Sequence, residues 1–211
     1  MKKVLPSAGL YVITPDALCH SEPLLLKAVQ AAIRGGAVMV QYRDKINDAD
    51  TRLRQAKALQ ALCREAAVPF LLNDGPVSAL SHSGLDGVHL GHSDGDLEEA
   101  RRLAPSAWLG ATCGQSIPRA VAAQAAGADY VAFGAFYAST TKPQAQRASV
   151  DLLPQARQAI HIPICAIGGI TPENAAPLIA AGANYIAAIS GVFAAGDIEA
   201  AARDYSRLFP R

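Results

Sequence analysis

The sequence predicts a (β/α)8 TIM barrel, a closed ring of parallel strands covered on its outside by helices. Short apolar runs alternate along the chain with longer segments in which apolar residues recur at helical spacing. The apolar runs are near-continuous, which is typical of parallel strands that are buried on both faces. Eight such strand–helix units fit into 211 residues, near the small end of the size range of this fold.

The elements are expected in strict alternation. The predicted strands are residues 10–13, 37–40, 70–72, 87–90, 107–111, 129–133, 164–167 and 185–189. The predicted helices are residues 22–34, 48–66, 76–81, 97–103, 117–126, 151–160, 172–181 and 198–208. Ser21 is the expected N-cap of the first helix, with Gly35 and Gly36 as its stop. Thr171, followed by Pro172, is the expected N-cap of the seventh helix.

A doubly wound open sheet is the alternative architecture for the same alternation of elements. The GxGxxG fingerprint that such a sheet normally carries for a dinucleotide is absent from the sequence, which disfavours this alternative. No linker or low-complexity tract interrupts the chain, so residues 1–211 are predicted to form one domain. The pattern Ala-Gly-Ala-(Asp or Asn)-Tyr occurs at residues 126–130 and 181–185, each time where a helix should stop and a buried strand should follow.

Composition narrows the classes of function. Hydrophobic residues make up 51% of the chain and charged residues 18%, which excludes a disordered protein. The net charge of +1 argues against broad binding to nucleic acid or to an anionic membrane, but it leaves room for a local basic pocket. No stretch reaches the roughly 18 apolar residues of a membrane span, and Pro6 breaks the apolar start that faintly imitates a signal peptide.

The four cysteines lie far apart and form no CxxC pair. This spacing suits reduced thiols in a cytosolic protein better than a disulfide framework or a zinc site. The chain is therefore expected to be cytoplasmic, with a homo-oligomer left open.

In a barrel of this kind the active site is built from the loops after the carboxyl ends of the strands. After the second predicted strand, Gln41, Arg43 and Lys45 alternate along the chain, so an extended backbone would point them to one side. Two cations and an amide that share one mouth suit a polyanion. The alternative is a surface ion pair between Arg43 and Asp44.

Two acidic residues follow the third and fourth predicted strands. Asp74 and Asp94, brought together from neighbouring loops, would need a cation between them, and Mg2+ carrying a substrate diphosphate is the expected guest. The alternatives are that Asp74 and Gly75 form only a turn, and that Asp94 or Asp96 only caps the next helix.

Histidine and cysteine near these loops are given no catalytic role. His89 lies within a predicted strand and is expected to be packed and hydrogen-bonded, rather than to form a zinc or iron site with His92 and Asp94. Cys113 is the only cysteine expected at the mouth of the barrel. Since no histidine partner is evident in the sequence, it is expected to be a spectator.

The loop after the sixth predicted strand is suited to holding a phosphate. Ser139, Thr140 and Thr141 can donate hydroxyl hydrogen bonds there, and Lys142 supplies a point charge. The alternative is a solvated loop that carries one surface lysine.

The loops after the seventh and eighth predicted strands form a second candidate for an anion. Residues 166–174 and 189–191 carry glycines and no acidic side chain at the turn. The corresponding loops of barrels frequently bind phosphate through backbone N–H groups and a helix N-terminus. The sequence therefore predicts one anion site at loops seven and eight and a second, cationic mouth at loops two and six.

Several motifs follow one another in order along almost the whole chain. They are Tyr11-Val-Ile-Thr14, Gln41-Tyr-Arg-Asp-Lys45, Leu72-Asn-Asp74, Gly87-Val-His-Leu-Gly91 with Asp94, Thr140-Thr-Lys142, Ala166-Ile-Gly-Gly-Ile170 and Ile189-Ser190. Through these motifs and their order, the chain resembles the thiamine phosphate synthase (thiamine-phosphate pyrophosphorylase) family. That family joins hydroxymethylpyrimidine diphosphate to a thiazole phosphate and releases pyrophosphate, so the resemblance implies a transferase of thiamine biosynthesis with two small phosphorylated substrates.

The resemblance also implies roles for single residues. Gln41, Arg43, Lys45, Asn73, Thr112 and Lys142 would hold the pyrimidine diphosphate, with Arg43, Lys45 and Lys142 as the catalytic cations. Ser139, Thr140, Thr141, Gly169, Ile189 and Ser190 would hold the thiazole phosphate, and Asp74 and Asp94 the magnesium ion. The family mechanism is dissociative, because diphosphate leaves before the thiazole nitrogen captures a pyrimidinyl methylene cation. Such a reaction demands charge neutralisation of the leaving group more than a general base.

The chain departs from the family pattern at three places. After the fifth predicted strand the family usually has a serine and, two residues later, a histidine, where this chain has Thr112 and Gly114. Thr112 can keep the hydroxyl contact, whereas Gly114 loses the imidazole. The usual proline of loop six is Ala135, and a Thr-x-Thr pair is here Ser139 and Thr141.

Two other functions remain open at this level. A thiazole tautomerase-like paralogue would bind the thiazole phosphate without coupling it, but it would not need the cations and aspartates that grip a diphosphate. A non-catalytic phosphate-ligand-binding module could use loops seven and eight without Asp74 and Asp94. Both are disfavoured because the cations and the two aspartates are retained together.

Overall fold

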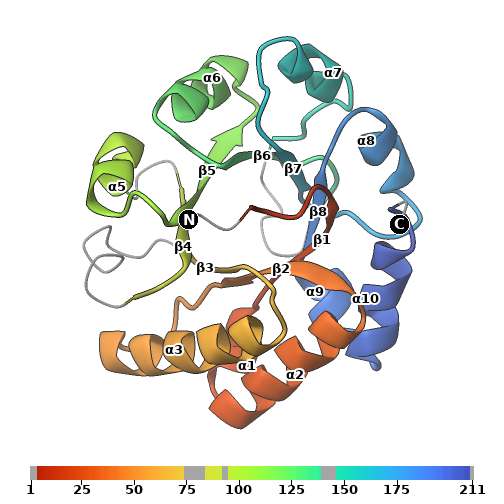
Figure 1. Cartoon of the computed structure of the whole chain (residues 1–211). Helices are drawn as coiled ribbons and strands as arrows, with labels where there is room; N and C mark the ends of the chain where they lie inside the picture. Colours follow the sequence, from red (N-terminus) through yellow and green to blue (C-terminus); the bar gives the residue numbers. More distant parts are fainter. Residues whose placement is uncertain (1–3, 74–83, 92–94, 139–145, 210–211) are drawn as a thin grey trace.

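Eight parallel strands pair with one another in chain order, and the first also pairs with the last, so the sheet closes on itself (Figure 1). The computed structural model describes residues 4–73, 84–91, 95–138 and 146–209. The strands are β1 (Gly9–Ile13), β2 (Ala37–Tyr42), β3 (Phe70–Asn73), β4 (Gly87–Leu90), β5 (Trp108–Gly114), β6 (Tyr130–Gly134), β7 (Ile164–Ile167) and β8 (Tyr185–Ala188). The predicted TIM barrel is confirmed, and its closure excludes the doubly wound open sheet.

Helices form a ring around the barrel in Figure 1. Those in the described part of the chain are α1 (Asp16–Cys19), α2 (Glu22–Arg34), α3 (Ala49–Glu65), α5 (Leu97–Leu103), α6 (Ile117–Ala125), α7 (Leu152–Arg157), α8 (Ala176–Ala180), α9 (Ser190–Phe193) and α10 (Ile198–Ser206). The one-turn helices α1 and α9 were not predicted, because four residues are too few to show a helical period. The helix predicted at residues 76–81 lies outside the described residues.

Some element boundaries differ from those predicted. Strand β5 runs on to Gly114, so Thr112 lies within the strand and not in the loop after it. Helix α8 begins only at Ala176, and the backbone N–H of Thr171 instead donates to Asn174 Oδ1 at 2.8 Å. The prediction of Thr171 as an N-cap was therefore wrong, because residues 171–175 form a turn that Asn174 closes.

Most of the longer helices have an N-cap residue with a short polar side chain that accepts a backbone hydrogen bond. The side chains of Asp48, Asp96, Ser116 and Asp197 cap α3, α5, α6 and α10 in this way. Asp96 is thus a helix cap, which agrees with the alternative prediction that Asp94 or Asp96 caps the next helix. Ser21 occupies the N-cap of α2, but its side chain makes no capping hydrogen bond. None of the helices in the described part combines the length and apolar character that crossing a bilayer requires.

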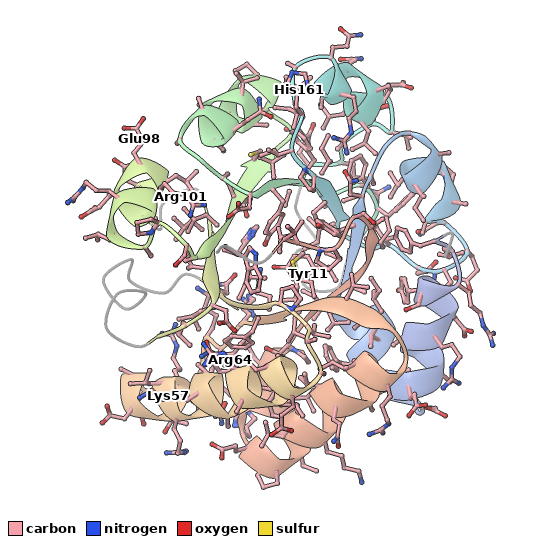
Figure 2. All side chains as sticks on the ribbon, viewed as in Figure 1. Tyr11, Lys57, Arg64, Glu98, Arg101 and His161 are labelled. Carbon is pink, nitrogen blue, oxygen red and sulfur yellow. The ribbon has the colours of Figure 1, made fainter. Side chains whose placement is uncertain are left out.

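The inside of the barrel is filled unevenly along its axis. Tyr130 and Tyr185 begin β6 and β8 and fill the amino end, where each is fully buried. Two residues further along the same strands stand Ala132 and Ala187, whose small side chains leave space toward the carboxyl end. Figure 2 shows Tyr11 in the centre of the ring. Because alternate strand residues face inward, this change from large to small side chains opens a cavity at one end only.

The first copy of the repeated sequence pattern forms a hydrogen-bonded corner at the amino end of β6. Arg101 of α5 donates to the carbonyl oxygen of Gly127 at 2.8 Å and to Asp129 Oδ2 at 2.8 Å. The same carboxylate oxygen accepts from the backbone N–H of Leu109 at 2.8 Å. The corner therefore ties a helix and two strands together on the face opposite the cavity.

The second copy builds the same corner with other residues. Arg157 of α7 donates to the carbonyl oxygen of Gly182 at 2.8 Å and to Asn184 Oδ1. Asn184 Oδ1 also accepts from the backbone N–H of Ile164 at 3.0 Å. The two copies of the sequence pattern thus form the same kind of hydrogen-bonded corner. Its position at the amino ends of the strands, where barrels carry stability and not catalysis, suggests no part in a reaction.

Replacing Arg101 by methionine is expected to lower the free energy of unfolding by about 2 to 4 kcal/mol, because Asp129 would keep a part-buried charge without its cation. Urea titration measures this change. The matched control is Arg102→Met on the same helix, whose exposed side chain lies 3.8 Å from Glu99 and should change stability by less than about 1 kcal/mol. Equal losses in the two variants would contradict the structural role of the corner.

Candidate active site at the carboxyl ends of the strands

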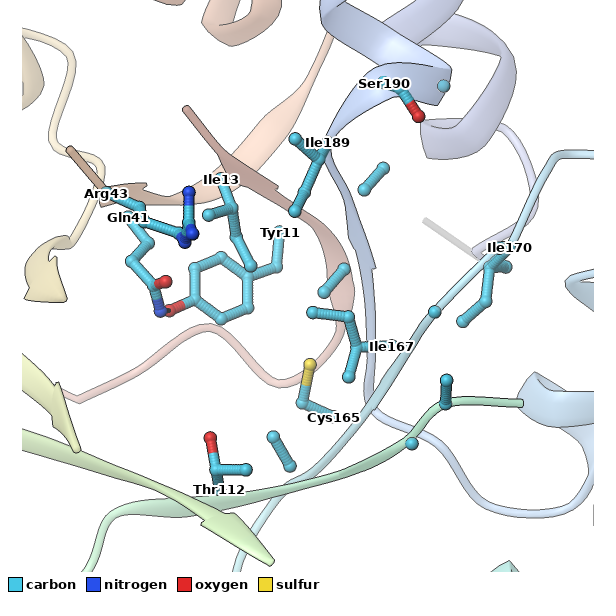
Figure 3. Close-up of a pocket in the computed structure, with 18 of the residues that line it drawn as sticks. Tyr11, Ile13, Gln41, Arg43, Thr112, Cys165, Ile167, Ile170, Ile189 and Ser190 are labelled. Carbon is cyan, nitrogen blue, oxygen red and sulfur yellow. Dashed lines mark hydrogen bonds between the residues drawn. The ribbon is translucent and has the colours of Figure 1, made fainter. Parts of the chain in front are cut away.

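The carboxyl ends of the strands enclose a pocket of about 490 Å³. Its polar lining residues are Tyr11, Gln41, Arg43, Asn73, His89, Thr112, Cys165, Thr171 and Ser190. Its largest apolar lining residues are Ile13, Ile167, Ile170 and Ile189. Figure 3 shows Gln41 and Arg43 on one side of Tyr11, with Ile170 and Ser190 across the pocket. The pocket therefore has one polar, cationic side and one side built from the loops after β7 and β8.

Arg43 points into this pocket and is paired with a residue that the sequence did not single out. Its Nη1 donates to both carboxylate oxygens of Asp16, at 3.2 Å and 3.1 Å. The other guanidinium nitrogens have no acceptor among the described residues, so they remain available to an anion. The predicted alternative of an ion pair between Arg43 and Asp44 was wrong, because Asp44 turns inward to other partners.

The backbone at Arg43 is held by a second residue of the β1 loop. Thr14 is fully buried, and its Oγ1 accepts from the Arg43 N–H at 2.9 Å while donating to the Arg43 carbonyl oxygen at 3.0 Å. The backbone N–H of Lys45 donates to Asp16 Oδ1 at 3.0 Å. The Lys45 side chain is exposed. Lys45 is not among the described residues that line the pocket. Because β2 ends at Tyr42, the strand alternation that grouped Lys45 with Gln41 and Arg43 does not extend to Lys45.

Asp44 is the buried organiser of the loop after β2. It accepts from the Tyr42 hydroxyl at 2.7 Å, from the Ile46 N–H at 2.9 Å and from Asn47 Nδ2 at 2.8 Å. Burial alone would raise the pKa of Asp44, but these hydrogen bonds outweigh it and lower the pKa below its usual value. The ionised carboxylate therefore holds the loop that presents Arg43.

A pH dependence of stability follows from Asp44. Since its pKa is lowered on folding, the carboxylate stabilises the fold above its unfolded pKa of about 3.9, and this contribution is lost as the pH falls through the folded pKa. Asp44→Asn should cost about 1.5 to 3 kcal/mol at pH 6, and the gap to the wild type should narrow below about pH 4. Urea titrations between these pH values measure the gap. Asp50→Asn, an exposed change in the first turn of α3, is the control. A gap that stays constant or widens in acid would contradict this role.

The loops after β6 and β7 are bound to each other beside the pocket. The backbone N–H of Tyr137 donates to the Gly168 carbonyl oxygen at 2.9 Å, and its hydroxyl donates to the Asn174 carbonyl oxygen at 3.0 Å. Asn174 Nδ2 donates to the Gly169 carbonyl oxygen at 3.1 Å. The Tyr205 hydroxyl of α10 donates to the Ile170 carbonyl oxygen at 2.8 Å. Carbonyl groups of this turn are thereby engaged, and this fixes the shape of the pocket wall.

The backbone N–H groups of Gly169 and Ser190 have no acceptor among the described residues. Both residues line the pocket, together with Ile189. The structure thus brings the three described residues of the predicted thiazole-phosphate site to one wall of the pocket, with donors left for an anion.

One of the three departures from the family pattern lies in β5, at Thr112 and Gly114. Thr112 lines the pocket, and its Oγ1 lies 2.8 Å from His89 Nε2. Gly114 also lines the pocket, with a φ of +58° and open space where a Cβ would stand. A side chain would fit there sterically, but the left-handed backbone favours glycine.

Cysteine placement differs from the prediction. Cys113 is fully buried on the outer face of β5, where burial raises the pKa of its thiol to about 12, and Cys165 lines the pocket instead. The prediction of Cys113 at the mouth was wrong because β5 continues past it. In an extended strand the inward side chain of Thr112 turns its neighbour outward. The expectation that Cys113 takes no part in chemistry agrees with its burial and raised pKa.

Several predicted site residues lie outside the described residues. They are Asp74, Asp94, Ser139, Thr140, Thr141 and Lys142. His92, which was considered only for the disfavoured zinc or iron site, also lies outside them. Within the described ranges no group of three or more His, Cys, Asp or Glu side chains could hold a metal ion. Asn73, directly before Asp74, lines the pocket and pairs in the sheet with His89 of β4.

Comparisons with known proteins give the same result for the sequence and for the fold. The family model for thiamine monophosphate synthase matches residues 10–192. A thiamine-phosphate synthase of Aromatoleum aromaticum is 52% identical over 202 residues, which is 95% of this chain and 96% of that protein. A thiamine-phosphate synthase of Thioalkalivibrio sulfidiphilus is 50% identical over 202 residues, 95% of each chain.

A solved structure agrees with these sequences. The thiamine phosphate pyrophosphorylase of Pyrococcus furiosus superposes with a TM-score of 0.84 at 32% identity, and the match covers 96% of this chain and 95% of that one. The family model includes every residue that lines the pocket, from Tyr11 to Gly191. The chain therefore belongs to the thiamine monophosphate synthase family.

Proposed function

We propose that the pocket at the carboxyl ends of the strands is where this transferase joins hydroxymethylpyrimidine diphosphate to a thiazole phosphate, giving thiamine phosphate and pyrophosphate. Family membership supports the reaction. One observation carries the placement. A single cavity has Gln41 and Arg43 on one side and the loop residues Gly169 and Ser190 on the other. A cavity with two chemically different walls suits a reaction that joins two ligands.

The pyrimidine diphosphate is assigned to the polar side. Gln41, Asn73 and Thr112 offer neutral polar groups for the ring, and Arg43 offers free guanidinium donors for the diphosphate. Lys45 and Lys142 are proposed to add positive charge at the rim, Lys45 from its exposed position after Arg43. The pairing of Arg43 with Asp16 keeps the guanidinium oriented before the substrate arrives.

The thiazole phosphate is assigned to the opposite wall. The backbone N–H groups of Gly169 and Ser190 are proposed to donate to the phosphate, and Ile189, which also lines the pocket, to contact the ring. Ser139, Thr140 and Thr141, which follow β6 in the sequence, are proposed to bind the same phosphate. The hydroxyl-rich composition of that loop supports this assignment.

Magnesium is proposed as the resident metal ion, held by Asp74 and Asp94. Carboxylate oxygens are the ligands that Mg2+ prefers, and a site with few protein ligands leaves positions for diphosphate oxygens. The pairing of β3 with β4 supports the assignment, because it brings the chain just before Asp74 next to the chain just before Gly91. When bound, the ion would neutralise charge on the leaving group.

The reaction is a substitution at the methylene carbon of the pyrimidine. The carbon–oxygen bond to the diphosphate breaks, and its electron pair leaves with the pyrophosphate. The lone pair of the thiazole nitrogen then forms the new carbon–nitrogen bond to the methylene cation. Arg43, Lys45 and Lys142 stabilise the charge that develops on the leaving oxygen, which is where a dissociative reaction needs it. No proton transfer is required, and this agrees with a pocket built from cations and neutral groups.

The remaining assignments concern the whole chain. Residues 1–211 are proposed to be one domain that acts in the cytoplasm on two small phosphorylated substrates, without nucleic-acid or membrane partners. The near-neutral composition supports this proposal. A homo-oligomer stays open.

The coupling assay tests the proposed function. Purified protein with both substrates and Mg2+ is expected to form thiamine phosphate and pyrophosphate in equal amounts. Isomerisation of the thiazole phosphate without coupling would instead indicate the tautomerase-like paralogue. Binding of thiamine phosphate without any turnover would indicate the non-catalytic module. Either result would contradict the proposal.

A further inference from the structure

Five side chains from β1, β2, β4, β5 and β6 form a continuous chain of hydrogen bonds, and four of the five line the pocket. Gln41 Nε2 donates to the Tyr11 hydroxyl at 2.7 Å, and the Tyr11 and Tyr130 hydroxyl oxygens are 2.7 Å apart. Tyr130 lies 2.7 Å from His89 Nδ1, and His89 Nε2 lies 2.8 Å from Thr112 Oγ1. We call these five residues the polar chain. Its two ends, Gln41 and Thr112, both line the pocket, whereas Tyr130 lies beneath it.

The amide at one end sets the direction of every hydrogen bond in the polar chain. Among the described residues, the Tyr11 hydroxyl contacts the Gln41 nitrogen, which donates to it, and the Tyr130 oxygen, so the Tyr11 hydrogen has Tyr130 as its acceptor. Tyr130 then has its hydrogen left for His89 Nδ1. An Nδ1 that accepts must carry no proton, which places the imidazole proton on Nε2, where it donates to Thr112. The hydroxyl hydrogen of Thr112 is therefore left to point into the pocket.

The opposite direction would satisfy the same groups, but it requires the oxygen of Gln41 at Tyr11. The structure has the Gln41 nitrogen there, as the close-up in Figure 3 shows. Gln41 Oε1 consequently turns away from the polar chain, and none of the described residues donates to it. The two pocket ends thus present opposite chemistry, an acceptor at Gln41 and a donor at Thr112.

The middle of the polar chain is held rigidly. Tyr11 and Tyr130 are buried, and their rings meet edge to face with centroids 5.8 Å apart. The His89 ring stacks on Tyr130 at 5.5 Å. The Tyr130 ring packs directly against Gly110 of β5, where a Cβ would overlap the ring, so this position requires glycine. Burial also raises the pKa of both tyrosines, so their hydroxyls stay protonated and can keep one direction.

We propose that Tyr11, Tyr130 and His89 are positioning residues that fix Gln41 as an acceptor and Thr112 as a donor, and so select an aminopyrimidine ring. Such a ring carries an amine that can donate to Gln41 Oε1 and unprotonated ring nitrogens that can accept from Thr112. An oxo-pyrimidine reverses this pattern at the amine position and would leave buried groups unpaired. The ligand in this inference rests on the proposed function, whereas the direction of the polar chain rests on the contacts alone.

The direction can be measured without any ligand or activity. In 15N NMR spectra of the folded, ligand-free protein at about pH 8, His89 should show a protonated Nε2 and an unprotonated Nδ1. In Gln41→Glu the carboxylate can only accept, so every bond should reverse and Nδ1 should become protonated. Gln41 is buried but lines the pocket, and glutamate keeps the shape of its side chain while replacing only the amide. An unchanged unprotonated Nδ1 in Gln41→Glu would overturn the proposal.

The selectivity is tested with the pyrimidine diphosphate and its analogue in which an oxo group replaces the ring amine. Tyr130→Phe breaks the polar chain in its middle and should raise the KM for the amine substrate about tenfold, the loss of about one buried hydrogen bond, with a smaller change in kcat. Its preference over the oxo analogue should fall by a similar factor, and His89 should show mixed tautomers.

Tyr185→Phe is the matched control for burial and packing. Its ring meets Tyr130 edge to face at 6.0 Å, but its hydroxyl donates to the Pro6 carbonyl oxygen, away from the polar chain. This variant should leave the His89 tautomer and the ring preference unchanged. Equal effects of Tyr130→Phe and Tyr185→Phe would mean that these tyrosines act only through packing, and this would overturn the proposal. If the wild type had the expected His89 tautomer but bound neither pyrimidine, the proposed function would be wrong. The aminopyrimidine would then be wrong as the ligand, but the direction of the hydrogen bonds in the polar chain would stand.

Discussion

Alanine at Asp74 or Asp94 is expected to abolish thiamine phosphate formation. In the proposed reaction the diphosphate leaves before the new bond forms, so any loss of charge neutralisation on the leaving group falls directly on the barrier. Removal of one of two carboxylates should empty the proposed Mg2+ site. A loss of at least about a thousandfold in kcat/KM corresponds to about 4 kcal/mol. The measurement is the coupling assay across a range of Mg2+ concentrations.

Asp96→Ala is the matched control for the two aspartates. Asp96 stands two residues after Asp94 and caps α5 by accepting from the Glu98 N–H at 2.8 Å. Its loss should cost about 1 kcal/mol of stability and leave kcat/KM nearly unchanged. Robust product formation by the wild type in the presence of a metal chelator would refute the metal assignment, as would activity in Asp74→Ala close to that of Asp96→Ala.

Arg43→Met is expected to lower kcat/KM for the pyrimidine diphosphate at least about a hundredfold, or about 2.7 kcal/mol. Arg43 lines the pocket with donors that no described residue occupies, and its Nη1 is anchored to Asp16. The methionine keeps much of the volume but removes the charge and the fork that binds two oxygens. Steady-state kinetics with the second substrate saturating measures the loss.

Two further variants separate charge from geometry at this position. Arg43→Lys keeps the charge and should recover only part of the activity, because an ammonium cannot bind two oxygens in a fixed plane. Arg54→Met removes an exposed cation that pairs with Glu22 at 3.2 Å outside the pocket, and it should behave as the wild type. If Arg43→Met stayed within about threefold of the wild type, the pyrimidine diphosphate would have to bind elsewhere.

The fold was predictable because its signals are local. Buried parallel strands give continuous apolar runs, and amphipathic helices give a 3.6-residue period, so most elements could be located within a few residues. The boundaries failed where tertiary contacts decide. Thr171 resembles a helix cap in sequence, but Asn174 closes a turn there first and delays α8 to Ala176. The one-turn helix α9 after β8 carries no period at all.

The site was only partly predictable, because its parts come from distant segments. Gln41, Arg43, Asn73 and Thr112 were expected at the mouth and line the pocket. Asp16 was missed because an acidic residue after Pro15 carries no motif, and only the pairing of β1 with β2 brings it to Arg43.

The polar chain was missed for a related reason. Tyr11, His89 and Tyr130 stand in apolar strands, and each one alone indicates an ordinary core residue. His89 was expected to be packed and hydrogen-bonded, which the structure confirms. Its partners, Thr112 of β5 and Tyr130 of β6, depend on the registers of β4 with β5 and of β5 with β6, which a closed barrel fixes and a sequence pattern does not. A tyrosine that faces a barrel interior near a histidine is the signal that could have indicated it.

A crystal structure of the protein with thiamine phosphate, pyrophosphate and Mg2+ tests the central claim most directly. The pyrimidine ring is expected between Gln41 and Thr112, the pyrophosphate at Arg43, and the phosphate of the product at Gly169 and Ser190. The product would then span the two walls of the one pocket at the carboxyl ends of the strands. Product bound outside this pocket, or a pyrophosphate with no contact to Arg43, would contradict the account.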